Sequence, residues 1–157
     1  TSIGAINSIK DLKNIKYITV HINGGFEMLK AIKKVSGKIK VLGVTVLTSL
    51  NNKSLKQIGY NKSVKKIIIK QAILAKRAGL DGVVCSPKEA SLVKNICKNM
   101  EIVTPGIRFV NDKLQDQKRI TSPMQAYNNG ATAIVIGRSI TKGNIKNNIK
   151  KLINSLK

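Results

Sequence analysis

Two loops of this chain contain the residue types that bind anions. Thr104-Pro105-Gly106-Ile107-Arg108 and Ile136-Gly137-Arg138-Ser139 each follow a short apolar run. A guanidinium can form two parallel hydrogen bonds to a phosphate, and a glycine lets backbone N–H groups approach the same anion. Arg108, Gly137 and Arg138 are therefore candidate phosphate-binding residues. For the first loop, an ordinary turn with a solvated arginine is the alternative.

A third loop, Thr45-Val46-Leu47-Thr48-Ser49, follows another apolar run and is rich in hydroxyl groups. A hydroxyl both donates and accepts hydrogen bonds, so this loop could bind a ring that bears amide groups. Capping of the next helix, or simple turn formation, explains the same residues equally well.

Catalytic and metal-binding groups are scarce in this sequence. His21 is the only histidine, and Cys85 and Cys97 lack a metal-ligand spacing. Cys85 fits a small buried residue better than a nucleophile, because no base is evident beside it. The seven acidic residues form no pair at general acid/base spacing. The sequence shows binding groups but no obvious catalyst, metal site or cofactor site.

The loops must be positioned by the elements around them, and apolar periodicity alternates between two kinds of segment. Short β-branched runs predict buried parallel strands. They span 17–21, 39–46, 82–85, 101–104 and 133–136. The three loops thus follow the second, fourth and fifth predicted strands, at the end where parallel α/β folds bind ligands.

Helical spacing of apolar residues separates these strands, with lysines on the opposite faces. The apolar positions are Ile3, Ile6 and Ile9; Met28, Ile32 and Val35; Val64, Ile67, Ile68, Ala72 and Ala75; Val93, Ile96 and Cys97; and Ile145, Ile149, Leu152, Ile153 and Leu156. Ser122-Pro123 predicts the cap and first turn of a further helix.

Alternating strands and helices predict an α/β fold with a parallel sheet, either open and doubly wound or closed as a (β/α)8 barrel. No linker interrupts the pattern, so we expect one domain over residues 1–157. Five βα units do not close an eight-stranded barrel. The chain opens on a helix at Thr1, so we expect a partial barrel whose first strands lie upstream.

The charge is strongly positive, at +22 with a pI of about 10.3, which is typical of proteins that bind polyanions. However, all but four of the 29 basic residues are lysines, and they are spread along the whole chain. We therefore interpret the charge as a solvated lysine surface, and we do not expect the protein to bind nucleic acid. No apolar run is long enough for a membrane span, so we expect a cytoplasmic protein.

Taken together, the motifs resemble bacterial orotidine 5′-phosphate decarboxylase. The matching stretches, in family order, are Val20-His21 with Gly24-Gly25, Val44-Thr45-Val46-Leu47-Thr48-Ser49, Gly79-Leu80-Asp81-Gly82-Val83-Val84-Cys85-Ser86, Val103-Thr104-Pro105-Gly106-Ile107-Arg108, Asp116-Gln117-Lys118-Arg119-Ile120, and Val135-Ile136-Gly137-Arg138 running into Ile140-Thr141. They cover essentially the whole chain and are jointly specific.

The resemblance implies a (β/α)8 barrel, usually a homodimer, that converts orotidine 5′-phosphate to uridine 5′-phosphate and CO2 in pyrimidine synthesis. It implies no metal and no organic cofactor. On matched positions, Arg138 and the Gly137 backbone resemble the phosphate site, and Arg108 lines the same pocket. Gln117 resembles the residue that bridges phosphate and pyrimidine, and Thr48 the hydroxyl that binds the pyrimidine.

The family's catalytic Lys and Asp residues lie in an Asp-x-Lys-x-x-Asp stretch just before a Pro-Asn-Thr segment. Thr1 resembles that threonine, which makes it another candidate substrate-binding residue. The resemblance therefore implies that the catalytic residues lie upstream of Thr1, and that residues 1–157 alone do not decarboxylate.

Two alternative functions stay open at this point. A related phosphate-binding barrel, such as a sugar-phosphate decarboxylase, an epimerase or an aldolase-like synthase, would share the phosphate site but not Thr48 and Gln117 together. A non-catalytic polyanion-binding protein would depend on the +22 charge alone.

Overall fold

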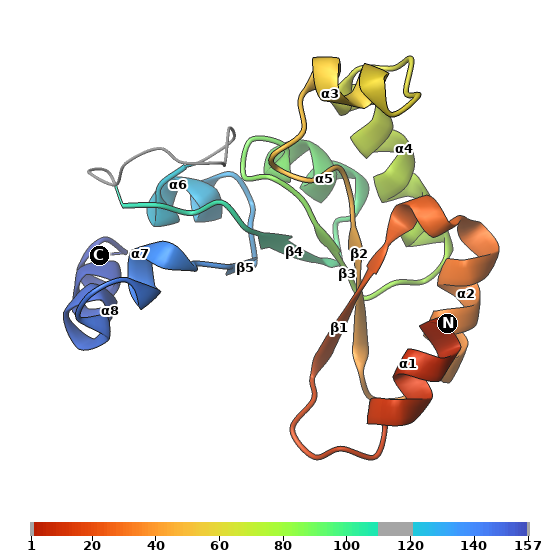
Figure 1. The fold of residues 1–157 in the computed structure, drawn as a ribbon, viewed down its shortest axis with the longest axis horizontal. Helices are drawn as coiled ribbons and strands as arrows, with labels where there is room; N and C mark the ends of the chain where they lie inside the picture. Colours follow the sequence, from red (N-terminus) through yellow and green to blue (C-terminus); the bar gives the residue numbers. More distant parts are fainter. Residues whose placement is uncertain (1, 110–120, 157) are drawn as a thin grey trace.

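The computed structural model describes residues 2–109 and 121–156, and its strands form one parallel sheet (Figure 1). The strands are β1 (Tyr17–His21), β2 (Lys40–Val44), β3 (Gly82–Val84), β4 (Glu101–Thr104) and β5 (Ala133–Ile134). They lie in the order β1-β2-β3-β4-β5, each hydrogen-bonded to its neighbour in sequence.

Helices precede, connect and follow the strands. They are α1 (Ser2–Ile9), a short 3-10 turn η1 (Ile22–Gly24), α2 (Phe26–Val35), α3 (Asn52–Gln57), α4 (Val64–Arg77), α5 (Ala90–Ile96), α6 (Pro123–Asn128), α7 (Arg138–Thr141) and α8 (Ile145–Asn154). The predicted cap at Ser122 is confirmed, because its Oγ accepts a hydrogen bond from the Gln125 N–H at 3.3 Å. Figure 1 shows α1, α2 and α4 at one end of the molecule, and α7 and α8 at the other.

The strand order decides between the two predicted architectures. A doubly wound sheet reverses its order at a switch point, whereas a (β/α)8 barrel adds each strand beside the previous one. This sheet has sequential order throughout its five strands, so it is an incomplete barrel wall. Within the described residues, β1 and β5 are its two edges.

All five predicted strands are confirmed, and three of them, β2, β3 and β5, are shorter than predicted. β2 stops at Val44, the last residue that pairs with β3, and the N–H and the Oγ1 of Thr45 then both donate to the Val84 carbonyl, at 3.1 and 2.9 Å. β5 stops at Ile134, the last residue that pairs with β4. The helix α3 was not predicted, because its six residues include only one buried apolar side chain, Leu55.

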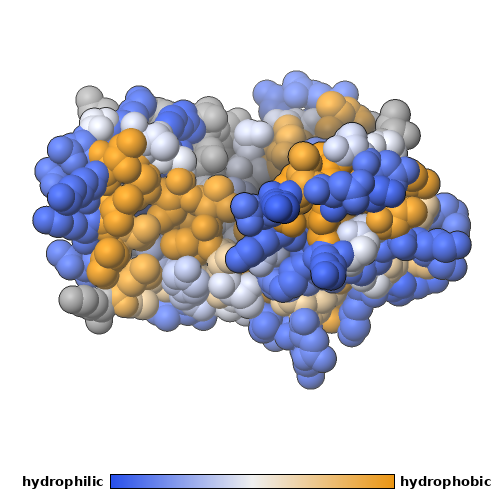
Figure 2. Space-filling view, turned by 90° about the horizontal axis from the view of Figure 1, so that it is seen from below, coloured by the Kyte–Doolittle hydropathy of each residue, from blue (hydrophilic) through white to orange (hydrophobic). Residues whose placement is uncertain are grey.

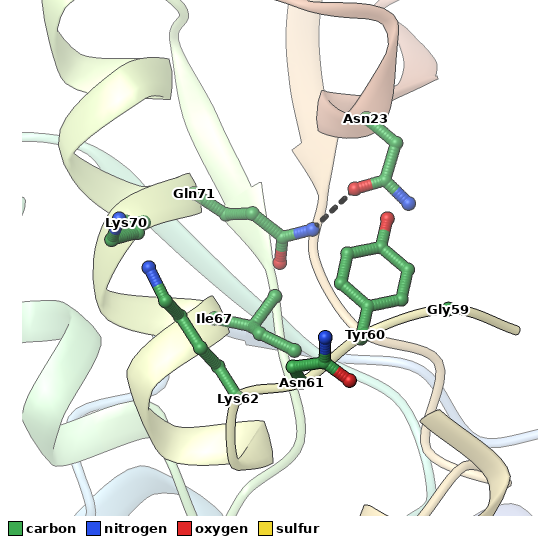
Figure 3. A pocket seen from close by; sticks show the side chains of 8 residues that line it. All are labelled: Asn23, Gly59, Tyr60, Asn61, Lys62, Ile67, Lys70 and Gln71. Carbon is green, nitrogen blue, oxygen red and sulfur yellow. Dashed lines mark hydrogen bonds between the residues drawn. The ribbon is translucent and has the colours of Figure 1, made fainter. Parts of the chain in front are cut away.

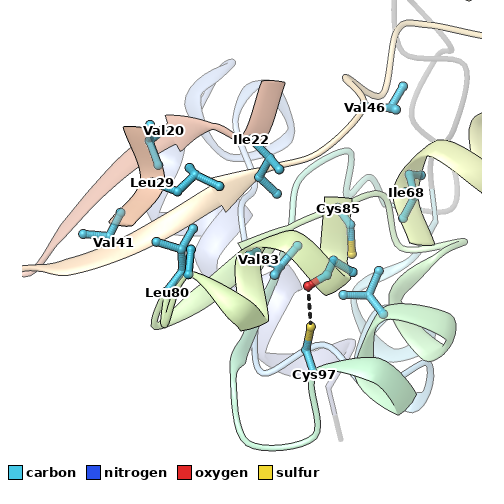
Figure 4. Packing of buried hydrophobic residues seen from close by; sticks show 14 of the residues in the cluster. Val20, Ile22, Leu29, Val41, Val46, Ile68, Leu80, Val83, Cys85 and Cys97 are labelled. Carbon is cyan, nitrogen blue, oxygen red and sulfur yellow. Dashed lines mark hydrogen bonds between the residues drawn. The ribbon is translucent and has the colours of Figure 1, made fainter. Parts of the chain in front are cut away.

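The main hydrophobic core lies between β1–β4 and the helices that cover them (Figure 4). Ile68, Val83 and Ile102 are fully buried there. Cys85 and Cys97 are buried in the same core as free thiols, as predicted for Cys85. The Cys97 Sγ lies 3.5 Å from the Ala72 carbonyl, and burial raises the pKa of this thiol.

The C-terminal helices do not join this core. Neither α7 nor α8 has a buried residue, and Ile145, Ile149 and Ile153 of α8 are 52%, 44% and 52% exposed. The apolar spacing predicted for this helix is correct, but the face it forms is open. Figure 2 shows a broad apolar surface at the end of the molecule where α8 lies. A barrel would bury such a face against strands.

Asp81 joins three elements at the amino-terminal edge of the sheet. The Lys33 ammonium of α2 lies 2.7 Å from each of its carboxylate oxygens. The Val41 N–H of β2 donates to Oδ2 at 2.7 Å. The Asp81 backbone bonds to Val41 on one side and to Glu101 on the other. One side chain thus ties a helix to the start of the strand ladder.

We therefore expect Asp81→Ala to destabilise the protein. It leaves the Val41 N–H and the Lys33 ammonium without their acceptor, which costs about 1–3 kcal/mol for hydrogen bonds of this kind. Urea denaturation followed by circular dichroism measures the change. Asp11→Ala, at an exposed position, is the matched control. Equal midpoints for the two variants would contradict this role of Asp81.

Gly82 allows β3 and β4 to approach closely. A Cβ at this position would lie 2.7 Å from the Glu101 carbonyl oxygen and 2.6 Å from the Leu42 side chain. We expect Gly82→Ala to lower the free energy of unfolding by about 1–3 kcal/mol, as overpacking does. In α1, Gly4 has no atom within 4 Å of an added Cβ, so Gly4→Ala should leave stability unchanged or raise it. Thermal unfolding of both variants tests the difference, and equal losses would contradict the explanation.

Candidate functional site

The two candidate arginines follow neighbouring strands at the same edge of the sheet. Thr104 of β4 and Ile134 of β5 are cross-strand partners, and Arg108 and Arg138 each lie four positions beyond them. Because parallel strands end together, the loops after β4 and β5 start side by side. The fold therefore places both arginines at the carboxyl edge of the sheet.

Arg108 is held in place by the backbone around it. Its side chain is buried, with 8% exposure, and its Nη1 donates to the Ile107 carbonyl at 2.9 Å. Its N–H donates to the Thr121 carbonyl at 3.1 Å, next to a bridge between Ile107 and Thr121. Gly106 has a φ of 84°, a left-handed conformation that favours glycine. This turn fixes a buried guanidinium, the kind of group that needs a nearby anion or hydrogen-bond acceptors.

Gly137 and Arg138 lie where the chain turns from β5 into α7. Gly137 is exposed and precedes the helix, and Arg138 is its first residue and partly buried. The Gly137 carbonyl accepts hydrogen bonds from Ile140 and Thr141, at 2.9 and 3.1 Å. These bonds fix the turn, so the Arg138 side chain starts from an ordered backbone.

Thr48 lies in the turn after β2, and its side chain is partly buried. Helix capping does not explain this loop, because Asn51 caps α3 by accepting a hydrogen bond from the Ser54 N–H at 2.9 Å. Thr45 is buried and bonds to Val84, so its hydroxyl serves the sheet. Since β3 separates β2 from β4, Thr48 lies one strand further from Arg108 than Arg138 does.

Two predicted substrate-binding residues, Thr1 and Gln117, lie outside the described residues. Thr104, which was not singled out, lies at the carboxyl end of β4, is fully buried, and its Oγ1 has no hydrogen-bond partner among the described residues. Its place before Pro105 and Gly106 is the signal that could have identified it.

An amide pair was also missed. The Nε2 of Gln71 in α4 donates to the Oδ1 of Asn23 in η1 at 2.7 Å. Gln71 interrupts the apolar face of α4, between Ile68 and Ala72, and this break in the pattern was the available signal. The pairing itself joins residues far apart in the sequence, so spacing alone does not predict it.

The structure describes residues 2–109 and 121–156. Within them, His, Cys, Asp and Glu side chains form no group of three or more that could hold a metal ion. None of the helices there is both long and apolar enough to cross a lipid bilayer.

Comparison with known proteins gives one consistent result. Residues 5–151 match the family described as orotidine 5′-phosphate decarboxylase / HUMPS. Orotidine 5′-phosphate decarboxylase of Wolbachia pipientis is 49% identical, over 87% of this chain and 61% of its own length. The enzyme of that name from Actinobacillus pleuropneumoniae serotype 5b is 41% identical, over 96% of this chain and 68% of its own length.

The fold gives the same result as the sequence. A crystal structure of orotidine 5′-phosphate decarboxylase from Lactobacillus acidophilus superposes with a TM-score of 0.83 and 30% identity, over 99% of this chain and 69% of that one. The chain thus spans about two thirds of the proteins that it matches. The matched family, its relatives and the sequential sheet agree, and the chain belongs to the orotidine 5′-phosphate decarboxylase / HUMPS family.

Proposed function

We propose that this chain is part of an orotidine 5′-phosphate decarboxylase, and that it supplies the phosphate-binding and pyrimidine-binding side of the site. The placement of Arg108 and Arg138 after two adjacent strands is the observation that supports this most directly. In barrels, the loops after the last two strands are a frequent phosphate site. Family membership supports the choice of substrate.

In this proposal, Arg138 and the Gly137 backbone bind the phosphate of orotidine 5′-phosphate. A guanidinium that donates two hydrogen bonds to a phosphate fixes both its position and its orientation. Arg108 lines the same pocket from the neighbouring loop, Gln117 bridges phosphate and pyrimidine, and Thr48 hydrogen-bonds the ring. The nucleotide then lies across the carboxyl edge of the sheet from β2 to β5.

The reaction breaks the bond between the ring and its carboxyl group. CO2 leaves, the electron pair stays on the ring carbon, and a proton replaces the carboxylate. The resemblance assigns that proton to a lysine and the destabilisation of the carboxylate to an aspartate, both upstream of Thr1. The residues of this chain contribute binding energy far from the reacting carbon, which lowers the barrier when it is realised in the transition state.

We propose further that residues 1–157 form the C-terminal part of one barrel domain. The open edges of β1 and β5, and the exposed apolar face of α8, fit surfaces that the remaining βα units would cover. A homodimer, expected from the resemblance, and a cytoplasmic location, expected from the sequence, stay predictions.

Uridine 5′-phosphate binding tests the phosphate site. We expect Arg138→Ala to weaken binding by about 10- to 100-fold, because a charge-assisted pair to the phosphate is lost. Isothermal titration calorimetry measures the dissociation constant. Arg77→Ala is the control, because this arginine lies 5.4 Å from the Phe26 ring on the outer helices. Equal weakening by both substitutions would contradict a specific site and favour general attraction by the positive surface.

This proposal assigns substrate binding to residues 1–157 and the catalytic groups to an upstream segment, which gives a second prediction. Residues 1–157 alone should release no CO2 from orotidine 5′-phosphate above the uncatalysed rate. Co-expression with the N-terminal βα units of the Wolbachia relative should restore release, because they would complete the barrel. Carboxyl-labelled substrate measures the reaction. Turnover by residues 1–157 alone would contradict the assignment of the catalytic groups to the upstream segment.

A further inference from the structure

A cavity of about 360 Å³ lies away from the candidate arginines, between η1, α4 and the connection that leads into α4. It is lined by Asn23, Gly59, Tyr60, Asn61, Lys62, Ile67, Lys70 and Gln71. Figure 3 shows these side chains converging from η1, from the α3–α4 connection and from α4. The proposed decarboxylase site does not use this cavity.

Gln71 has an unused acceptor at this cavity. The residue is 6% exposed, and its Nε2 is bonded to Asn23, but its Oε1 is buried without a hydrogen-bond partner among the described residues. Figure 3 shows this oxygen directed toward the space between Lys62, Ile67 and Tyr60. Because burying an acceptor without a donor is unfavourable, a ligand that donates a hydrogen bond here would be stabilised.

Two lysines approach the same cavity from one side. Lys62 and Lys70 are exposed, and neither forms an ion pair with an acidic residue in the part of the chain that the structure describes. The proximity of Lys70 lowers the pKa of Lys62, with smaller contributions from desolvation and from Lys66. Two like charges without a counter-ion repel each other, so an anion between them is attracted by both.

A second, smaller cavity of about 180 Å³ adjoins the first and shares Asn23, Tyr60, Ile67 and Gln71 with it. Its other lining residues are mainly apolar, except for His21 and Thr45 at the strand ends. Together the two cavities present the ammonium groups of Lys62 and Lys70, the Gln71 Oε1 acceptor, and the apolar lining of the smaller cavity. This sequence of groups suits a small organic molecule that is anionic at one end.

We propose that this cavity binds a small hydroxylated organic phosphate, with the phosphate between Lys62 and Lys70 and a hydroxyl donating to Gln71 Oε1. Two ammonium groups match the double charge of a phosphate monoester better than the single charge of a carboxylate. The hydroxyl is required because the phosphate dianion has acceptors only. Oε1 is buried in this structure, so the proposal requires a lining side chain to change rotamer when the ligand binds.

The test uses sn-glycerol 3-phosphate as the probe and calorimetry or NMR titration of the whole chain as the measurement. We expect 1:1 binding that the double variant Lys62→Met/Lys70→Met weakens at least tenfold. The double variant Lys65→Met/Lys88→Met is the matched control, because it removes the same two positive charges from residues that line a different cavity. This variant should bind as the unmodified protein does.

Comparison of probes tests the Gln71 contact without changing a buried residue. Propyl phosphate has the same charge but no hydroxyl, so it should bind about three- to tenfold more weakly than sn-glycerol 3-phosphate. Glycerol, which lacks the phosphate, should not bind measurably. Equal affinity of the two phosphates would overturn the hydroxyl contact.

Two further outcomes would overturn the site itself. If Lys65→Met/Lys88→Met weakens binding as much as Lys62→Met/Lys70→Met does, the attraction comes from the overall positive charge and not from this cavity. If Arg138→Ala abolishes binding of sn-glycerol 3-phosphate, the phosphate occupies the proposed decarboxylase site instead. Lys62→Met/Lys70→Met should leave uridine 5′-phosphate binding unchanged. The proposal for this cavity and the proposal for the decarboxylase site can therefore fail independently.

Discussion

Parallel strand pairing in sequential order is the constraint on which this structure depends. Each strand must be followed by a crossover that returns the chain to the amino edge, so all strands end at the carboxyl edge and every loop with a functional candidate emerges there. Asp81 and Gly82 secure the opposite edge, one by charged hydrogen bonds and one by the absence of a side chain. The arginine loops can therefore differ in shape while their starting points stay fixed by the ladder.

Local pattern was sufficient to predict the strands and most helices, because buried β-branched runs and helical spacing depend on nearby residues. It was insufficient for α3, which buries little apolar surface, and for the end of β2, where the apolar run continues to Val46 but pairing with β3 stops at Val44. Among the site residues, the positions of Arg108 and Arg138 followed from strand ends. The Asn23–Gln71 pair did not, because it forms only when distant elements pack.

The two proposed anion sites use different chemistry, although both draw on a chain with a net charge of +22. Arg108 is a buried guanidinium whose backbone is fixed by a bridge to Thr121. Lys62 and Lys70 are exposed ammonium groups on flexible side chains, beside a buried amide. A preorganised guanidinium binds one geometry closely, whereas lysines adapt to several. We therefore expect selective binding at the arginine site and more permissive binding at the cavity with Lys62 and Lys70.

The weak attachment of the C-terminal segment has a consequence for folding cooperativity. β5 pairs with β4 at only two positions, and α7 and α8 bury no residue, whereas β1–β4 share one continuous core. Segments with few buried contacts open at a lower free energy than the unit they border. We therefore expect the segment with Arg138 to open more readily than the β1–β4 unit, and a partner surface that covers α8 would stabilise it.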